Sequence, residues 1–306
     1  MRRARTLAVG LTSALVALSA CGVAEQSRPD AATQVSARRA TAVRVVAVGD
    51  IACAPGSAVT RTTCRQGATA RLAERLSPRR VLALGDLQYQ SGGLAAFRTA
   101  YDGSWGRLRS ITHPVPGNHE YVTRGAAGYY TYFADRQPGP PGWYVRDLGT
   151  WRAYFLNSNC DKVDCSAEAT WLARDLAAHP RRCSLVVTHH PRWSSGEHGS
   201  NRSVARFYRV AYDHHVELML SGHDHHYERF VPKRPDGTRS ARGVVQFVSG
   251  TGGKSFYPAD HVVRGSAYRI SHRFGVLQLS LGSGRYAWSW KGIGGATRDS
   301  GSRSCT

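Results

Sequence analysis

Short apolar runs recur along the chain at lengths that suit buried β-strands. They occupy residues 42–49, 80–85, 183–189, 216–222, 243–250 and 274–281. Between several of them lie segments with helical periodicity, at residues 67–76, 166–179 and 203–215. Strands that alternate with helices in this way predict an α/β fold with mixed β-sheets, and we expect the later strands to be antiparallel.

Polar side chains that could carry chemistry come where apolar runs stop. Asp50 and Asp86 each follow a run that ends in glycine. Three further segments end in the same way with Asn118 and His119, with His189, and with His223 and His225. Ligands of open α/β sheets bind at the carboxyl ends of the strands, because the loops that leave the strands converge there. We therefore expect five segments to bring these side chains to a common rim.

Each of these pieces has an ordinary structural explanation when it stands alone. An aspartate after a strand usually caps a helix or a turn, and a His-x-His pair is more often hydrogen-bonded than metal-bound. Together, however, the segments supply two carboxylates, an amide oxygen and three imidazoles, and Tyr89 follows Asp86 closely. A structural zinc site normally takes four Cys or His ligands, whereas paired catalytic metals need a carboxylate that bridges them. This set of side chains favours two metal ions over one.

The N-terminus has the pattern of an export signal. Three arginines among the first five residues precede an apolar stretch that is too short to span a bilayer. The tetrapeptide LSAC at residues 18–21 resembles a bacterial lipobox, so we expect residues 1–21 to direct export and Cys21 to carry a lipid. A plain secretory signal and an uncleaved anchor are the alternatives. Residues 22–41 lack apolar periodicity and are expected to form a flexible tether.

Six further cysteines form an even set, and disulfides are their default state in an exported chain. Short loops and the fastening of the C-terminus favour the pairs Cys53 with Cys64, Cys160 with Cys165, and Cys183 with Cys305. The sequence alone leaves this connectivity open. No Cys-x-x-Cys pair occurs, so a zinc cluster of these cysteines is not expected.

The formal net charge of +20 at pH 7 would suit an anionic substrate, a nucleic acid or an anionic cell-surface polymer. Only four of the 41 basic residues are lysines, so a general bias towards arginine would explain much of the excess. The arginines are scattered and are not interleaved with aromatic residues, which argues against nucleic-acid binding.

Five ordered blocks carry a resemblance to a known family. The blocks GDIA (49–52), GDLQY (85–89), GNHE (117–120), VVTH (186–189) and GHDH (222–225) resemble the signature of the calcineurin-like metallophosphoesterases. The tyrosine of the second block and the extension GHDHHYER narrow the resemblance to the purple acid phosphatases. It spans residues 43–290 and implies a four-layer α/β/β/α sandwich with two mixed β-sheets. Residues 42–306 would form the catalytic domain, of the smaller type that has no additional domain.

Transferred position by position, the resemblance implies a dinuclear metal centre. Asp50, Tyr89 and His225 would bind Fe(III), and Asp86 would bridge the two ions. Hard carboxylate and phenolate oxygens suit a trivalent ion, whereas imidazoles suit a divalent one. The second ion would be Fe(II), Zn or Mn, held by Asn118, His189 and His223.

The resemblance also implies two histidines that act on substrate without binding metal. His119 would hold a phosphoryl oxygen. His198 would contact substrate and help to protonate the leaving group, although its loop carries no motif and a surface histidine is the alternative. Glu120 either orients His119 or starts the next helix. Three neighbours of the ligands are expected to face away from the site: His190, His226 and Tyr227.

The first block departs from the family pattern at one position. Purple acid phosphatases usually have Asp-x-Gly there, whereas this chain has Ala52 in place of the glycine. The added methyl group restricts the backbone, so we expect a slightly different first turn and little effect on Asp50.

These expectations describe a secreted or surface-anchored phosphatase that hydrolyses phosphomonoesters with a dinuclear metal centre. One alternative is a Mn- or Zn-dependent phosphodiesterase or nucleotidase of the same superfamily, in which Tyr89 would not be a ligand. Another is a surface lipoprotein that only binds phosphate or metal. We expect a monomer that acts on small phosphoesters, with substrate preference set by loops at residues 90–110, 124–142 and 190–203.

Overall fold

The computed structural model describes residues 42–306, and the predicted export signal and tether lie outside these residues. The first of two β-sheets has six strands in the order β13-β12-β11-β1-β2-β3. In that order they span Thr297–Ser304, Arg285–Gly292, Gly275–Gly282, Val43–Val48, Arg80–Leu84 and Thr112–Val115. β1, β2 and β3 are parallel to one another, whereas β11, β12 and β13 form antiparallel pairs, as the sequence predicted for the later strands.

The second sheet has seven strands in the order β10-β8-β9-β7-β6-β5-β4. In that order they span Ser266–Ile270, Tyr227–Phe230, Val245–Ser249, Leu218–Ser221, Ser184–Val187, Trp151–Phe155 and Tyr144–Leu148. The central strands β5, β6, β7 and β9 are parallel, and β4, β8 and β10 pair in antiparallel fashion. Both sheets are therefore mixed.

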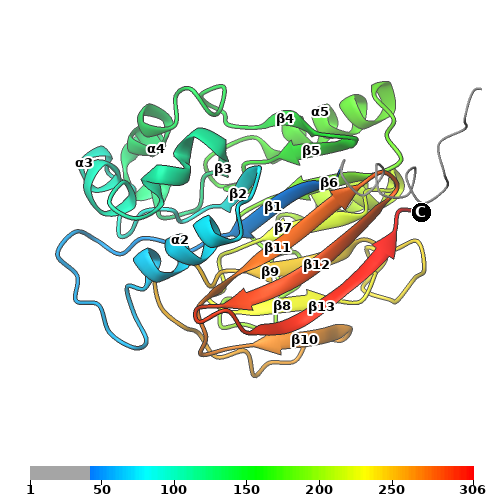
Figure 1. Cartoon of the computed structure of the whole chain (residues 1–306). Coiled ribbons are helices and arrows are strands. Elements are labelled where there is room, and N and C mark those ends of the chain that lie inside the picture. The colour runs from blue at the N-terminus through cyan, green and yellow to red at the C-terminus, as the bar shows by residue number, and fades with distance from the viewer. Residues whose placement is uncertain (1–41) are drawn as a thin grey trace, which may run out of the picture.

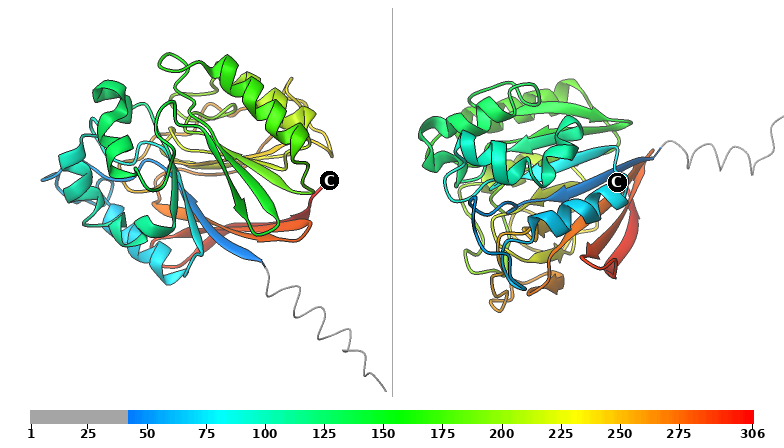
Figure 2. Two further views of the ribbon diagram at one scale, coloured as in Figure 1. Left: turned by 90° about the horizontal axis from the view of Figure 1, so that it is seen from above. Right: turned by 60° about the vertical axis from the view of Figure 1, so that its left-hand side comes forward.

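Helices cover the outer face of each sheet (Figure 1). The α-helices are α2 (Gln66–Arg75), α3 (Leu94–Ala96), α4 (Ala127–Tyr132), α5 (Cys165–Ala178) and α6 (Ala205–Asp213). Shorter helical turns are η1 (Phe97–Tyr101), η2 (Trp105–Ile111), η3 (Glu120–Val122) and η4 (Arg124–Ala126). Apolar residues of α2 and α4 pack with the first sheet, and those of α5 and α6 pack with the second. Figure 2 shows the same layers from two further directions. The predicted four-layer α/β/β/α sandwich is confirmed.

The continuous apolar runs arise because the central strands are buried on both faces. In β1, Val45 and Ala47 point into the core between the two sheets, whereas Val46 and Val48 pack beneath the helices. Side chains of a strand alternate between its faces, so a strand with helices on one side and a sheet on the other has no polar face. This burial on both faces explains why the sequence shows these strands as continuous apolar runs without alternating polar residues.

β13 was missed by the sequence pattern because its residues are mainly polar and exposed. It forms by pairing with β12 along Arg285–Lys291, and β12 brings Trp290 into the core. Backbone hydrogen bonds to a neighbouring strand do not require apolar side chains. The partner strand thus determines the structure of this segment.

All three favoured disulfides are present and fasten different parts of the fold. Cys53–Cys64 closes a loop after β1, and Cys160–Cys165 closes a loop before α5. Cys183–Cys305 joins the start of β6 to the C-terminal end of β13. The third disulfide spans the two sheets, so it fixes the edge of the sandwich.

Removing the third disulfide should destabilise the fold more than removing the second. Replacing both Cys183 and Cys305 by serine is expected to lower the free energy of unfolding by about 5 kcal/mol, against about 2 kcal/mol for Cys160 and Cys165. The sequence separations are 122 and 5 residues, and a longer cross-linked loop restricts the unfolded chain more. Urea titration of the two double variants measures both values, and equal losses would contradict the argument from loop entropy.

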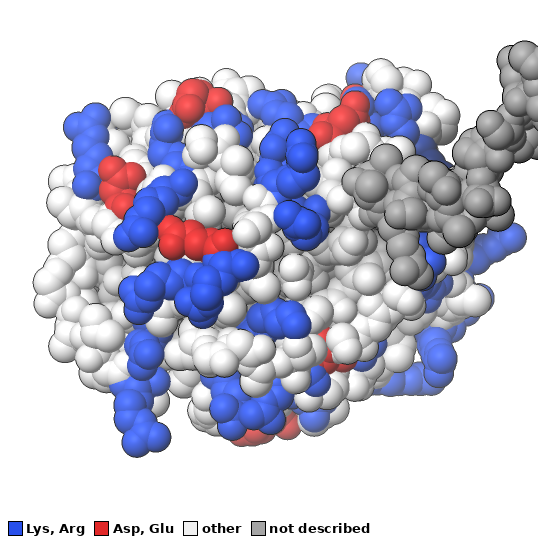
Figure 3. Space-filling view, viewed as in Figure 1, with Lys and Arg blue, Asp and Glu red and all other residues white. Residues whose placement is uncertain are grey.

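Basic side chains are spread over the surface in separate groups, with carboxylates between several of them (Figure 3). Some arginines are neutralised locally, since Arg152 pairs with Asp175 and Arg229 pairs with Asp299. Within residues 42–306, no helix combines the length and the apolar character needed to cross a bilayer.

Candidate metal centre

The predicted donor side chains come from loops of both sheets. The first sheet contributes Asp50 after β1, Asp86 and Tyr89 after β2, and Asn118 after β3, and the second contributes His189 after β6 and His223 and His225 after β7. Loops that leave the carboxyl ends of parallel strands lie at one edge of a sheet. The sandwich places the two edges together, so the seven side chains meet although they are far apart in sequence.

One half of the site gathers around the phenol of Tyr89. Its hydroxyl oxygen lies 3.0 Å from Asp50 Oδ1, 3.0 Å from Asp86 Oδ2 and 3.0 Å from His225 Nε2. A phenol has one hydrogen to donate and so cannot satisfy two carboxylates at once. A shared cation among these oxygens would satisfy all of them.

The other half of the site is rich in imidazole. His189 Nε2 lies 3.0 Å from Asn118 Oδ1 and 3.2 Å from His223 Nδ1. It also lies 3.4 Å from Asp86 Oδ2, the same oxygen that contacts Tyr89. Asp86 therefore stands between the two halves, which is the position that a bridging carboxylate needs.

The buried charges of this cluster suit a bound cation. Asp50 and Asp86 are almost fully buried, and neither pairs with a lysine or arginine in the described part of the chain. Burial and the facing carboxylate of Asp50 raise the pKa of Tyr89 well above its usual value. Although burial opposes both shifts, His189 lowers the pKa of Asp86, and Asp86 raises the pKa of His189 to about 9. Buried carboxylates are normally paired or bound to metal, so this donor set fits metal ions.

Three of the predicted ligands have backbone conformations that residues other than glycine rarely adopt. The φ angles are 60° at Asp50, 50° at Asp86 and 72° at His223. Such angles persist where the surrounding structure enforces them, and they concentrate at functional sites. Ala52 is not strained in this way and is fully buried, and its N–H donates to Leu87 O. Alanine therefore fits the first turn.

His119 lies beside the cluster and is partly exposed. Its Nδ1 donates to the carbonyl oxygen of Gln90 at 2.6 Å, because a carbonyl can only accept. Its backbone N–H donates to Asp86 Oδ1 at 2.9 Å, and its Nε2 lies 3.9 Å from Asp86 Oδ2. The ring is thus held next to the donor atoms with Nε2 free to meet a ligand.

The structure also brings His198 to the site. The His198 ring stacks on the His223 ring, with 4.3 Å between centroids and 25° between planes. Its backbone N–H donates to Asp224 Oδ1 at 2.9 Å. His198, whose position the sequence left open, therefore lies at the rim of the metal centre.

Residues 223–228 serve both the donor cluster and the loop that carries His198. His223 and His225 face the cluster. On the other side, Asp224 accepts from Ser194 Oγ, and Glu228 accepts from the N–H of Ser195 at 2.8 Å. The carboxylates in this segment thus position the 194–198 loop against the site.

The orientations predicted for the histidines and the tyrosine next to the ligands are partly confirmed. His226 contacts Glu228 at 3.1 Å and Tyr227 donates to Asp299 at 2.7 Å, so both face away. The prediction for His190 is wrong, because one of its nitrogens lies within 4.8 Å of donor atoms of His189 and His223. Burial lowers the pKa of His190 to about 3, which keeps the ring neutral.

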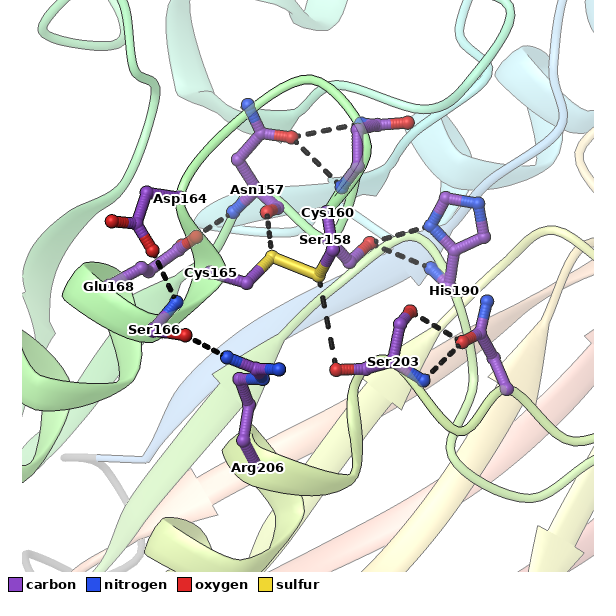
Figure 4. Close-up of a disulfide and its surroundings, with 12 residues drawn as sticks. Asn157, Ser158, Cys160, Asp164, Cys165, Ser166, Glu168, His190, Ser203 and Arg206 are labelled. Carbon is purple, nitrogen blue, oxygen red and sulfur yellow. Dashed lines mark hydrogen bonds between the residues drawn. A yellow bond between two sulfur atoms is a disulfide. The ribbon is translucent and has the colours of Figure 1, made fainter.

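Ser158 explains the orientation of His190 (Figure 4). Its Oγ accepts the backbone N–H of His189 at 3.1 Å and of His190 at 2.9 Å, so its own hydrogen is free for His190 Nδ1 at 2.9 Å. His190 Nε2 then carries the ring proton. A ring whose Nδ1 accepts a hydrogen bond and whose Nε2 is protonated offers no lone pair to a metal. His190 is therefore a hydrogen-bond donor beside the cluster and is not expected to be a metal ligand.

Glu120 has a role that the sequence did not reveal. Glu120 begins the short helix η3, which is one of its two predicted roles. Its carboxylate is fully buried, and within the described residues its hydrogen bonds go to backbone N–H groups other than that of His119. Its oxygens accept four backbone N–H groups, those of Asp86, Leu87, Gln88 and Gly117, at 2.7–3.2 Å. Glu120 therefore ties the loop after β2 to the loop after β3.

Glu120→Gln should destabilise the protein by about 2–4 kcal/mol, because an amide NH₂ would face N–H groups that need an acceptor. Thermal unfolding monitored by circular dichroism measures the loss, and metal analysis tests whether the loop still holds Asp86 in place. Glu74→Gln is the matched control, since Glu74 lies on the surface and pairs loosely with Arg107 at 3.7 Å. Similar melting temperatures for the two variants would refute this role.

Comparison with known families agrees with this arrangement. Residues 43–227, more than half of the 306 residues, match the calcineurin-like phosphoesterase family. The chain belongs to this family. The matched segment includes every predicted donor, from Asp50 to His225.

Among characterised relatives, the phosphoesterase is similar to purple acid phosphatases. It is 26% identical to purple acid phosphatase 23 of Arabidopsis thaliana over 170 residues, which cover 49% of this chain and 37% of that protein. It is 31% identical to the tartrate-resistant acid phosphatase type 5 of Mus musculus over 121 residues, which cover 39% of this chain and 29% of that protein. The matches therefore span only about a third of each relative's length.

Solved structures share the fold over most of the chain. The purple acid phosphatase PPD1 from yellow lupin seeds superposes with a TM-score of 0.67 at 17% identity, over 86% of this chain and 54% of that one. GAP50, described as the anchor in the inner membrane complex of Plasmodium, superposes with a TM-score of 0.64 at 17% identity, over 87% and 90%. Identities this low show a common fold, and the function must be argued from the site.

Proposed function

We propose that this chain is a metal-dependent phosphoric ester hydrolase that cleaves phosphomonoesters, similar to the purple acid phosphatases. The observation that carries the proposal is the position of Asp86, whose Oδ2 contacts the phenol of Tyr89 at 3.0 Å and His189 at 3.4 Å. One carboxylate between an oxygen-rich and an imidazole-rich set of donors suits two metal ions of different hardness.

Seven residues would hold the metals in this proposal. Asp50, Tyr89 and His225 would hold Fe(III), and Asp86 would bridge to Fe(II), Zn or Mn. The ligands of the divalent ion would be Asn118, His189 and His223. Such a pair supplies Lewis-acid stabilisation of charge on the phosphoryl oxygens and activates water for in-line attack.

The remaining polar groups would bind and orient the phosphoester. His119, whose Nδ1–H is held by Gln90 O, would donate from Nε2 to a phosphoryl oxygen as the protonated imidazolium, in which both ring nitrogens carry hydrogen. His198, stacked on His223 and held by Asp224, would face the leaving group and supply its proton. The catalytic domain of residues 42–306 thus contains every group that the proposal needs.

We also propose that the domain works outside the cytoplasm as a monomer, either secreted or held at the membrane by a lipid on Cys21. The three disulfides of the described residues suit an oxidising compartment. Partitioning of the natural protein into detergent tests the lipid anchor, and recovery of the intact protein in the aqueous phase alone would reject it.

Hydrolysis of 4-nitrophenyl phosphate by the purified protein tests the proposed function, and Tyr89→Phe tests the metal assignment. If Tyr89 binds Fe(III) as a phenolate, the concentrated wild-type protein should be violet, as the resemblance implies. Tyr89→Phe should lose this colour because the oxygen is absent. The fold should survive, since the ring remains. A colourless protein that is fully active with Mn or Zn alone would support the alternative of a phosphodiesterase or nucleotidase. A protein that binds metal but hydrolyses no ester would support the alternative of a surface lipoprotein that only binds phosphate or metal.

A further inference from the structure

A loop that the sequence did not connect with substrate preference lies against the metal centre. It follows β9 and comprises residues 252–257, here called the β9 loop. Its backbone is fixed at both ends: Gly252 N–H donates to Gly49 O at 3.0 Å, and Tyr257 N–H donates to His225 O at 3.3 Å. In the middle, Lys254 N–H donates to Asp50 O at 3.1 Å. The backbone of this loop is therefore held in place before any ligand binds.

Two side chains of the β9 loop support His225. Ser255 Oγ contacts His225 Nδ1 at 2.8 Å, which leaves Nε2 directed at Tyr89. The Tyr257 ring lies parallel to the His225 ring, with 3.9 Å between centroids. These contacts place the loop next to the donor cluster.

The third side chain, Lys254, reaches over Tyr89. Its Nζ lies 5.2 Å from the centroid of the Tyr89 ring. The ring of His119 packs against the same tyrosine, with 4.3 Å between centroids. Lys254 and His119 thus contact the same aromatic ring, and Lys254 is only partly buried.

The ammonium group of Lys254 has no polar partner within the described residues, unlike the other three lysines of the chain. Lys162 pairs with Asp161 at 2.9 Å. Lys233 donates to Arg264 O at 2.8 Å, and Lys291 donates to Thr297. An ammonium group with three free donors, carried by an anchored backbone beside a phosphoryl site, is suited to bind an anion.

We propose that Lys254 binds a second phosphoryl group adjacent to the scissile one, so that the enzyme favours phosphoanhydrides such as nucleoside diphosphates over monoesters with an uncharged leaving group. In the reaction, water adds to the terminal phosphorus and releases a proton to solvent, the P–O bond of the anhydride breaks, and the leaving phosphate of the nucleoside monophosphate takes the electron pair. Lys254 would neutralise charge on that phosphate. The inference rests on the proposed function, because the metal centre must hold the scissile group.

The test compares ADP with AMP, which differ by the second phosphoryl group. For Lys254→Met, the ratio of kcat/KM for ADP to that for AMP should fall by about tenfold to a hundredfold, the range for loss of one charged hydrogen bond. Lys254→Arg should restore most of the ratio, since it keeps the charge. Lys162→Met, which removes an exposed lysine, should leave the ratio at the wild-type value.

The outcomes separate this inference from the proposed function. Equal losses on ADP and AMP in Lys254→Met would overturn the inference, because Lys254 would then act on the common phosphoryl group or on the fold alone. Wild-type activity of Lys254→Met on both ADP and AMP would also overturn it. So would a wild-type enzyme that hydrolyses 4-nitrophenyl phosphate but not ADP. A wild-type protein that hydrolyses none of the three esters would instead reject the proposed function. Metal content and circular dichroism of each variant identify any loss of structure.

Discussion

Asp86→Ala is expected to abolish phosphoester hydrolysis and to remove most of the bound metal. Asp86 Oδ2 lies at hydrogen-bond distance from Tyr89 and at 3.4 Å from His189, so its loss separates the two halves of the site. Two cations held without a bridging carboxylate would repel each other, and each would lack one ligand. Metal analysis of the purified variant, together with kcat/KM for 4-nitrophenyl phosphate, measures both effects.

Asp86 also accepts the backbone N–H of His119, so the alanine variant requires a check on folding. Asp86→Asn keeps the size of the side chain and should likewise lose metal, because an amide is a poor bridge. Asp213→Ala removes an exposed aspartate at the end of α6 and serves as the surface control. An Asp86→Ala protein that keeps a full complement of metal and hydrolyses esters would contradict the bridging role.

His119→Ala is expected to lower kcat by about a hundredfold to a thousandfold, which is the usual cost of one donor aimed at developing charge. The variant should keep its metal, because the side chain is fixed by Gln90 rather than by a predicted ligand. The separation of activity from metal content is the decisive result. Single-turnover kinetics and metal analysis of the same sample measure it.

His179→Ala provides the matched control for His119→Ala. His179 is exposed, caps α5 and contacts Asp175. It precedes β6, whereas the predicted ligand His189 follows the opposite end of that strand. Its loss should leave kcat unchanged. If His119→Ala emptied the metal site, His119 would belong to the metal-binding set and the division between ligands and substrate-binding histidines would be wrong.

Much of the fold could be predicted from the sequence because the central strands carry their own signal. β1, β2, β6 and β7 are buried on both faces. Because neither face can be polar, each strand is visible in the sequence as a short apolar run. The polar residue after each run marks the carboxyl end of a strand, which is where the loops of parallel strands converge. These features are local, and they placed Asp50, Asp86, Asn118 and the histidines at a common rim, whereas the role of Tyr89 came from the resemblance to the purple acid phosphatases.

The tertiary structure decided which further groups surround these donors. β9 lies beside β7 in the sheet although β8 intervenes in sequence, and this neighbour relation places Lys254 next to Tyr89. The direction of His190 depends on Ser158, and the position of His198 depends on Asp224. Each of these contacts joins segments that are at least 26 residues apart in sequence. The sequence by itself determined which side chains end the strands, whereas only the packing of the two sheets decided which side chains meet, because strand order and loop contacts depend on pairings between distant segments.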